Sequence, residues 1–251
     1  MATLVQSIWD SDGGADPAAI TITEPTEGNL LVAVVTERGG GSTANHVLTS
    51  ITGWTHEISE TTEQGDGSHR RSFSVFWKIA GASEGTTLTA DDGTSNSKWL
   101  SFHEFSFDGA ENQWILSQKA TFNNGTAGDA TSLATGTTAS VTGTTFLELG
   151  FVIGRQGTVS VSDNDTTSWT NGLVAEFEQG ISTNAMFHMM GYDGDDTTEE
   201  AKSSVATFAN SNCYSANSGC NGAILVFSLI SAAGGLSIPI AAYHYNQMGR
   251  L

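Results

Sequence analysis

The chain has 251 residues, which is enough to bury a substantial hydrophobic core. Hydrophobic residues make up 38% of it and charged residues only 14%, a composition that excludes a disordered polyampholyte and argues against a membrane protein. With 27 acidic against 9 basic residues the net charge is −18, which repels polyphosphates, so we expect no nucleic acid among its partners.

Strand signals recur along the chain, and turn-forming clusters separate them. They are runs of β-branched and aromatic residues at 29–36, 72–80, 99–107, 146–153, 174–177, 185–190 and 223–230. Gly, Asn, Asp and Ser gather between these runs, and no long helical period is present. The pattern predicts an all-β protein, an antiparallel β-sandwich of the jelly-roll-like kind, over residues 1–235.

The two halves of the chain repeat the same order of features. The run at 29–36 is followed by Trp54 in a turn, and the run at 146–153 is followed by Trp169 in a similar turn. We therefore expect two pseudo-repeat halves, at about 28–110 and 144–232, forming either two stacked domains or one sandwich. A single sandwich is favoured, because an open sheet of about four strands would leave one apolar face uncovered.

Both ends of the chain are candidates for assembly arms. Residues 236–251 follow Gly234-Gly235 and are predicted to form an extended C-terminal arm that docks on a neighbouring subunit. Residues 3–9 are expected to act likewise. The uncharged stretch 223–243 contains Ser, Gly and Pro, which favours a buried strand followed by this arm over a membrane span. The candidate contact residues of the C-terminal arm are Leu236, Ile238, Pro239, Ile240, Tyr243 and Tyr245.

Two groups of side chains suggest bound metal or a covalent link. Acidic residues in two loops supply the hard oxygen ligands that calcium prefers, although their spacing is not that of an EF-hand. Cys213 and Cys220 flank a short loop, and the sequence is equally consistent with a disulfide between them and with a pair of free thiols. We expect no other cofactor. The calcium candidates are Asp163, Asp165, Asp193, Asp195 and Asp196.

No motif in the sequence predicts catalysis. Gly81-Ala-Ser83-Glu-Gly85 has the spacing of a nucleophile elbow, but a strand-like run follows it where that motif requires a helix. Trp54 and Trp169 occupy equivalent places in the two halves, which favours packing roles, with stacking on a glycan as the alternative. The sequence therefore indicates a protein that is not an enzyme.

Four motifs follow one another in the first half of the chain. Gly-Asn-Leu-Leu-Val-Ala-Val-Val at 28–35 is followed by Gly-Trp-Thr at 53–55, Phe-Trp-Lys-Ile-Ala at 76–80 and Phe-Ser-Phe-Asp-Gly at 105–109. Their order resembles that of β-sandwich virion proteins of tailed bacteriophages. The resemblance covers roughly residues 28–110, and more weakly the second half and the tail. It implies a capsid-decoration, cement, head-fibre or tail-associated protein, and it identifies no catalytic residue.

The same resemblance sets expectations for partners and location. Such a component would form homo-oligomers, for example trimers, and would contact other virion proteins such as the major capsid protein. The first 16 residues lack the pattern of a signal peptide, so we expect synthesis in the host cytoplasm and a final place in the virion. The alternative function is a glycan-binding, receptor-recognition module of a tail fibre or adhesin.

Overall fold

Fifteen β-strands and no helix make up the regular structure in the computed structural model, over the residues it describes. These residues are 1–9, 18–38, 47–63, 70–91, 93, 97–108, 112–125, 132–155, 166–180, 186–208 and 220–231. The all-β prediction is confirmed. The strands are β1 (Ala2–Trp9), β2 (Ala18–Thr21), β3 (Leu30–Arg38), β4 (Thr55–Glu63), β5 (Arg70–Ile79), β6 (Thr87–Ala90), β7 (Ser97–Phe107), β8 (Asn112–Gly125), β9 (Ser132–Ser140), β10 (Phe146–Arg155), β11 (Thr166–Trp169), β12 (Val174–Gly180), β13 (Met186–Asp196), β14 (Ala201–Phe208) and β15 (Cys220–Ser231).

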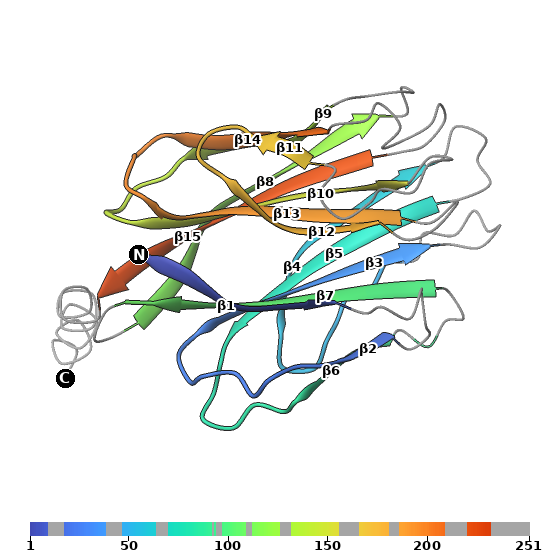
Figure 1. Cartoon of the computed structure of the whole chain (residues 1–251), viewed down its shortest axis with the longest axis horizontal. Coiled ribbons are helices and arrows are strands. Elements are labelled where there is room, and N and C mark those ends of the chain that lie inside the picture. The colour runs from blue at the N-terminus through green and yellow to red at the C-terminus, as the bar shows by residue number, and fades with distance from the viewer. Residues whose placement is uncertain are drawn as a thin grey trace, which may run out of the picture.

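Two five-stranded antiparallel sheets pack face to face in the middle of the molecule (Figure 1). The first sheet has the order β1-β7-β3-β5-β4, and the second has the order β12-β13-β10-β15-β8. The pair β2-β6 covers the outer face of the first sheet, and the three-stranded sheet β11-β14-β9 covers the outer face of the second. The predicted antiparallel β-sandwich is therefore confirmed.

The strand orders of the two halves correspond to each other. In the first half the large sheet contains the first, seventh, third, fifth and fourth strands, while the second and sixth pair outside it. If β11 is left out of the count, the second large sheet contains the fourth, fifth, third, seventh and first strands of the second half, which is the same order in reverse. The second and sixth strands of that half, β9 and β14, pair outside the large sheet. Among the described strands none pairs across the halves. The jelly-roll description and the repeat boundaries stay predictions.

The position of strand β3 explains why its own sequence is a nearly continuous apolar run. Leu30, Val32 and Val34 face the second large sheet, whereas alternate residues such as Leu31 and Ala33 face the β2-β6 layer. Successive side chains of a strand point to opposite faces, so a strand covered on both faces needs apolar residues throughout. The prediction that this run is a buried central strand is confirmed.

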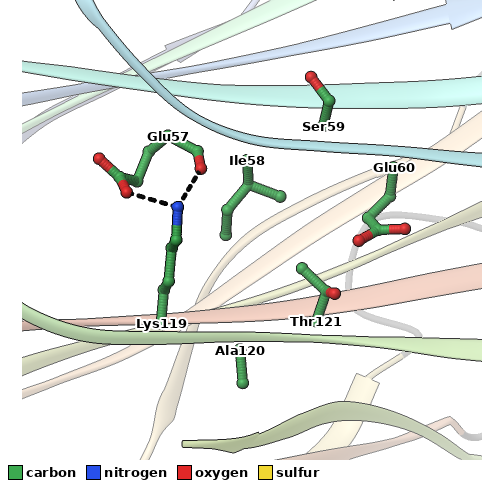
Figure 2. A pocket seen from close by; sticks show the side chains of 7 residues that line it. All are labelled: Glu57, Ile58, Ser59, Glu60, Lys119, Ala120 and Thr121. Atoms are coloured by element: carbon green, nitrogen blue, oxygen red, sulfur yellow. Dashed lines mark hydrogen bonds and ion pairs between the residues drawn. The ribbon is translucent and has the colours of Figure 1, made fainter.

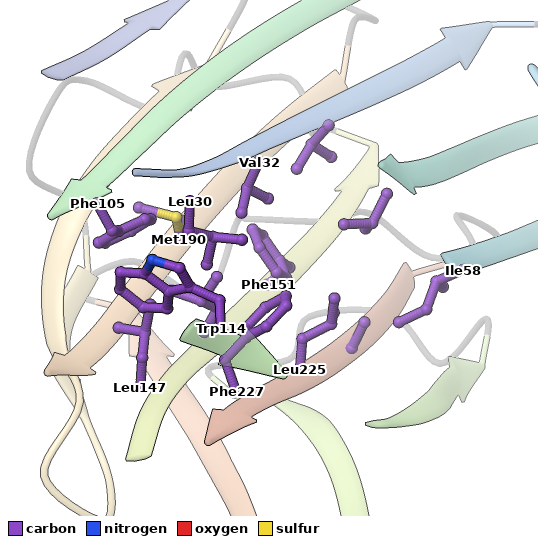
Figure 3. Close-up of a cluster of buried hydrophobic side chains, with 14 of the residues drawn as sticks. Leu30, Val32, Ile58, Phe105, Trp114, Leu147, Phe151, Met190, Leu225 and Phe227 are labelled. Carbon is purple, nitrogen blue, oxygen red and sulfur yellow. The ribbon is translucent and has the colours of Figure 1, made fainter. Parts of the chain in front are cut away.

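The main core lies between the two large sheets and draws on both halves of the chain (Figure 3). Side chains of the first sheet such as Val32 and Phe105 meet Phe151, Leu225 and Phe227 of the second. The ring centroids of Trp77 and Phe227 lie 5.4 Å apart in an edge-on arrangement. Because this core joins residues far apart in sequence, each half covers the largest apolar face of the other.

All four edge strands of the large sheets are irregular. The register shifts in β1, β4, β8 and β12, whereas β3 pairs with both of its neighbours without a shift. A bulge twists a strand and interrupts its pairing, which protects an open sheet edge against the addition of another strand. The residues left out of register are Val5, Glu57, Ser117, Asn124 and Glu176.

The structure corrects one expectation about the ends of the chain. Residues 3–9 do not form a free arm, because β1 pairs with β7 from Ala2 opposite Phe107 to Trp9 opposite Ser101. The predicted C-terminal arm, from Leu236 onward, lies outside the described residues.

Within the described residues there is no helix with the length and apolar character needed to cross a membrane.

Candidate functional site

A cleft opens where the edge strands β4 and β8 of the two large sheets face each other (Figure 2). Residues 57–60 and 119–121 line it, and its volume is about 290 Å³. Lys119 Nζ lies 2.7 Å from Glu57 Oε1 and donates a hydrogen bond of 2.7 Å to the backbone oxygen of the same residue. Trp77 Nε1 donates to the other carboxylate oxygen, Glu57 Oε2, at 3.0 Å. Lys119 and Glu57 thus bind each other and link the two sheets.

We expect Lys119→Met to cost little stability. The Lys119 side chain is 47% exposed, so solvent screens its ion pair with Glu57. Replacement should lower the free energy of unfolding by about 1 kcal/mol or less, measured by urea denaturation. The difference between the variant and the parent should shrink further in high salt. A loss several times larger would contradict the view that this bridge is a surface interaction.

A second cleft of about 290 Å³ opens at the opposite edge of the sandwich. It lies between the start of β1 and strands β12 and β13, and it is lined by Met1, Ala2, Gly172, Val174 and residues 192–195. A Cβ atom at Gly194 would collide with the backbone oxygen of Ala2, so glycine is required for this approach of β1. In the strand-order correspondence β4 matches β12 and β8 matches β1, so the two clefts occupy equivalent positions.

The second cleft has its own titratable groups. Asp193 Oδ1 accepts a hydrogen bond of 3.1 Å from the backbone N–H of Asp195. Burial raises the pKa of the Asp193 carboxyl, and the bond from Asp195 offsets part of that rise. Burial also raises the pKa of Tyr192, and the nearby Glu176 carboxylate adds to the effect.

Two histidines lie in the interior between the large sheets. His103 Nδ1 lies 2.9 Å from Ser7 Oγ, and His103 Nε2 lies 3.1 Å from Ser101 Oγ, which is also 3.4 Å from His188 Nδ1. Burial lowers the pKa of His188 to about 3. Burial, and then the charge of His188, lower the pKa of His103 well below its usual range. Because both pKa values are lowered, the two imidazoles are uncharged at neutral pH. Neither histidine lines either of the two clefts.

The two tryptophans proposed as glycan contacts pack against the protein. Trp169 is only 8% exposed, and a Cβ atom at Gly191 would lie 2.9 Å from its ring. Trp54 is half-buried, with its ring 6.4 Å from that of Phe102 and Lys78 Nζ 5.4 Å above it. Neither tryptophan lines either of the two clefts described above, and their glycan role stays a prediction.

The calcium candidates and the cysteines are described only in part. Asp193 and Asp195 lie in the second cleft, whereas Asp196 binds Lys202. Over the described ranges, no three side chains among His, Cys, Asp and Glu are grouped to hold a metal ion. Cys220 is buried at the start of β15. Asp163, Asp165 and Cys213 lie outside the described residues, so that part of the calcium site and the disulfide stay predictions.

Sequence reasoning missed the groups that the fold brings together. Lys119 and Glu57 are 62 residues apart and meet only because the two sheets face each other. One signal was present in β14, where Lys202 shares the buried face with Ala206 and Phe208. The alternation of that strand places a lysine inside the protein.

The fold defines an antiparallel β-sandwich of four layers whose clefts lie at its open edges. Comparison with protein-family models, with curated proteins and with solved structures found no match.

Proposed function

We propose that this chain is a non-catalytic structural component of a bacteriophage particle, which acts by assembling with copies of itself and with other virion proteins. The observation that carries the assembly role is the placement of exposed apolar side chains on the edge strands. Val5 on β1 is 51% exposed, Ile115 and Phe122 on β8 are 49% and 48% exposed, and Val174 on β12 is 63% exposed. Large apolar side chains left in water along the open sheet edges support a role in contact with other molecules.

The shape of the edges favours contact through side chains over the addition of a strand. Each of these edge strands has a register shift, which interrupts the regular row of backbone groups that an added strand would need. Side chains such as Val174 and Phe122 still project into solvent. A surface of this kind supports closed oligomers of defined size and disfavours open-ended fibres.

Charge and sequence motifs support the virion part of the proposal. A net charge of −18 maintains solubility and keeps particles apart except where specific surfaces meet. The order of motifs over residues 28–109 resembles that of phage β-sandwich virion proteins, and a capsid-decoration, fibre or tail protein needs a stable fold with outward contacts. Both points agree with a component present in many copies.

The oligomeric mass of the purified full-length chain tests the assembly role. We expect a defined oligomer by size-exclusion chromatography with light scattering, and a shift toward monomer for the double variant Ile115→Ser, Phe122→Ser. Ile79→Ser is the matched control, because Ile79 is also exposed but belongs to the inner strand β5. Truncation after Gly235 separately tests the C-terminal arm. A parent chain that stays monomeric up to its solubility limit contradicts self-assembly.

A further inference from the structure

Three ionisable side chains meet on the outer face of the second large sheet, beneath the outer strands. Glu148 comes from β10, Asp196 from the end of β13 and Lys202 from β14. Lys202 Nζ lies 3.1 Å from Glu148 Oε1, and it donates a hydrogen bond to Asp196 Oδ2. Lys202 is therefore shared by the two carboxyl groups, and the three side chains form one cluster.

The surroundings of this triad, Glu148, Asp196 and Lys202, exclude most water. Glu148 is 1% exposed and Lys202 is 3% exposed. The Phe146 ring lies below the ammonium group, with its centroid 5.7 Å from Lys202 Nζ, and it packs with Val141, Ile224 and Val226. An ion pair in such surroundings has lost much of its hydration, and this loss offsets the attraction between its charges.

The surroundings of the triad set the protonation states of its three groups. Burial raises the pKa of Glu148, and the hydrogen bond with Asp196 raises it further, so Glu148 holds a proton at neutral pH. Burial would raise the pKa of Asp196, but its hydrogen bonds with Glu148 and Lys202 outweigh that effect and keep it ionised. Burial would lower the pKa of Lys202, yet bonds to both carboxyl groups raise it. The triad is thus a neutral acid beside a balanced ion pair.

We propose that Asp196 and Lys202 become joined by an intramolecular isopeptide bond between Asp196 Cγ and Lys202 Nζ, with Glu148 as the catalytic acid. The geometry carries this proposal. The amine nitrogen is held against the carboxyl group that it would attack, and the Glu148 carboxyl group lies 3.1 Å from the same nitrogen. Holding reacting groups in contact removes most of the entropic barrier to their reaction.

The reaction is a condensation that needs no outside reagent. Lys202 first gives one proton to the Asp196 carboxylate, which turns the ion pair into a neutral amine and a neutral acid. The nitrogen lone pair then attacks Cγ and a C–N bond forms. Glu148 donates its proton to the departing hydroxyl group as the C–O bond breaks, and it takes back one proton from the nitrogen. An amine and an acid become an amide and one water, and Glu148 ends as it began.

Burial favours the product over the ion pair. The amide carries no charge, so it avoids the desolvation penalty that the separated charges pay in an apolar site. Exclusion of water also slows the reverse hydrolysis. The bond would close the turn between β13 and β14 and lock the outer sheet onto the large one. This inference is independent of the proposed function, because it rests only on the triad.

Mass spectrometry of the intact, reduced and denatured full-length chain tests the proposal. We expect the parent to be lighter than its sequence mass by one water. Glu148→Gln should restore the full mass, because it removes the acid and keeps the shape. Glu200→Gln is the matched control and should keep the loss, since the exposed Glu200 carboxylate lies 4.0 Å from Lys202 Nζ. A folded parent chain with its full sequence mass overturns the proposal, and a loss of water that persists in Glu148→Gln overturns the role of Glu148.

Proteolysis locates the bond. Cleavage of the denatured chain after Glu199 and Glu200 places Asp196 and Lys202 on different peptides. These peptides should stay joined if the isopeptide bond is present. Cyclisation at Asp193-Gly194 would also release one water, but it would leave the two peptides separate. Separation of the peptides in a chain that has lost water therefore refutes the link, and this measurement requires no variant that must fold.

Discussion

Between pH 7 and pH 5 the protein should lose about 2 kcal/mol of stability through His188. Burial lowers the pKa of His188 to about 3 in the folded chain, against about 6.5 in the unfolded chain. As the pH falls, the unfolded chain takes up the proton first and is favoured. The loss therefore begins near pH 6.5, grows down to about pH 3, and is absent above neutrality.

The effect of His188 is best measured as a difference between variants. Glu148 acts in the opposite direction, because its raised pKa makes the folded chain bind protons first as the pH falls. Thermal or urea unfolding of the parent and of His188→Gln at pH 7 and pH 5 isolates the histidine. Phe151→Leu is the control, since it alters packing beside His188 without removing a titrating group. Equal pH dependence in the parent and His188→Gln would show that burial of this imidazole carries no penalty.

Phe227→Ala should cost about 3–5 kcal/mol, which is enough to unfold most of a marginally stable domain. Phe227 is fully buried in the main core, and its ring contacts that of Trp77 from the facing sheet. Removal of the ring leaves a cavity between two sheets whose regular backbone pairing prevents them from closing over it. Urea denaturation at neutral pH measures the loss.

Phe122→Ala is the matched control for the core variant. Phe122 is of the same residue type, but it lies on the edge strand β8 and is about half exposed. At protein concentrations that keep the chain monomeric, its replacement should change the free energy of unfolding by about 0.5 kcal/mol or less. Similar losses for the two variants would mean that the interface between the sheets is not the main source of stability.

The sequence was sufficient to identify the strands that are buried on both faces or strongly aromatic. The runs that form β3, β7, β10 and β15 are rich in apolar residues because both of their faces pack. Strands β2, β4, β8, β11 and β14 were missed. Two of them, β2 and β11, have only four residues, and the other three are rich in polar residues. Strand β1 was assigned to an arm, since the shift at Val5 breaks its alternation.

The charged groups could be predicted less well than the strands. Whether a lysine such as Lys202 lies in solvent or inside the protein depends on which sheet covers its strand. The alternation of the strand shows only that Lys202 shares a face with apolar residues. The contact of Lys119 with Glu57 depends on how the two large sheets face each other. Such contacts follow from tertiary packing, which no local pattern encodes.

The location of the main core between the two halves also bears on synthesis. The first large sheet is complete once β7 has left the ribosome, but its inner apolar face is covered only by strands that include β10 and β15. A nascent chain therefore exposes side chains such as Val32 and Phe105 until β15 has emerged. A chain interrupted before β15 would lack Leu225 and Phe227 and would leave part of this surface in water, where exposed apolar side chains promote aggregation.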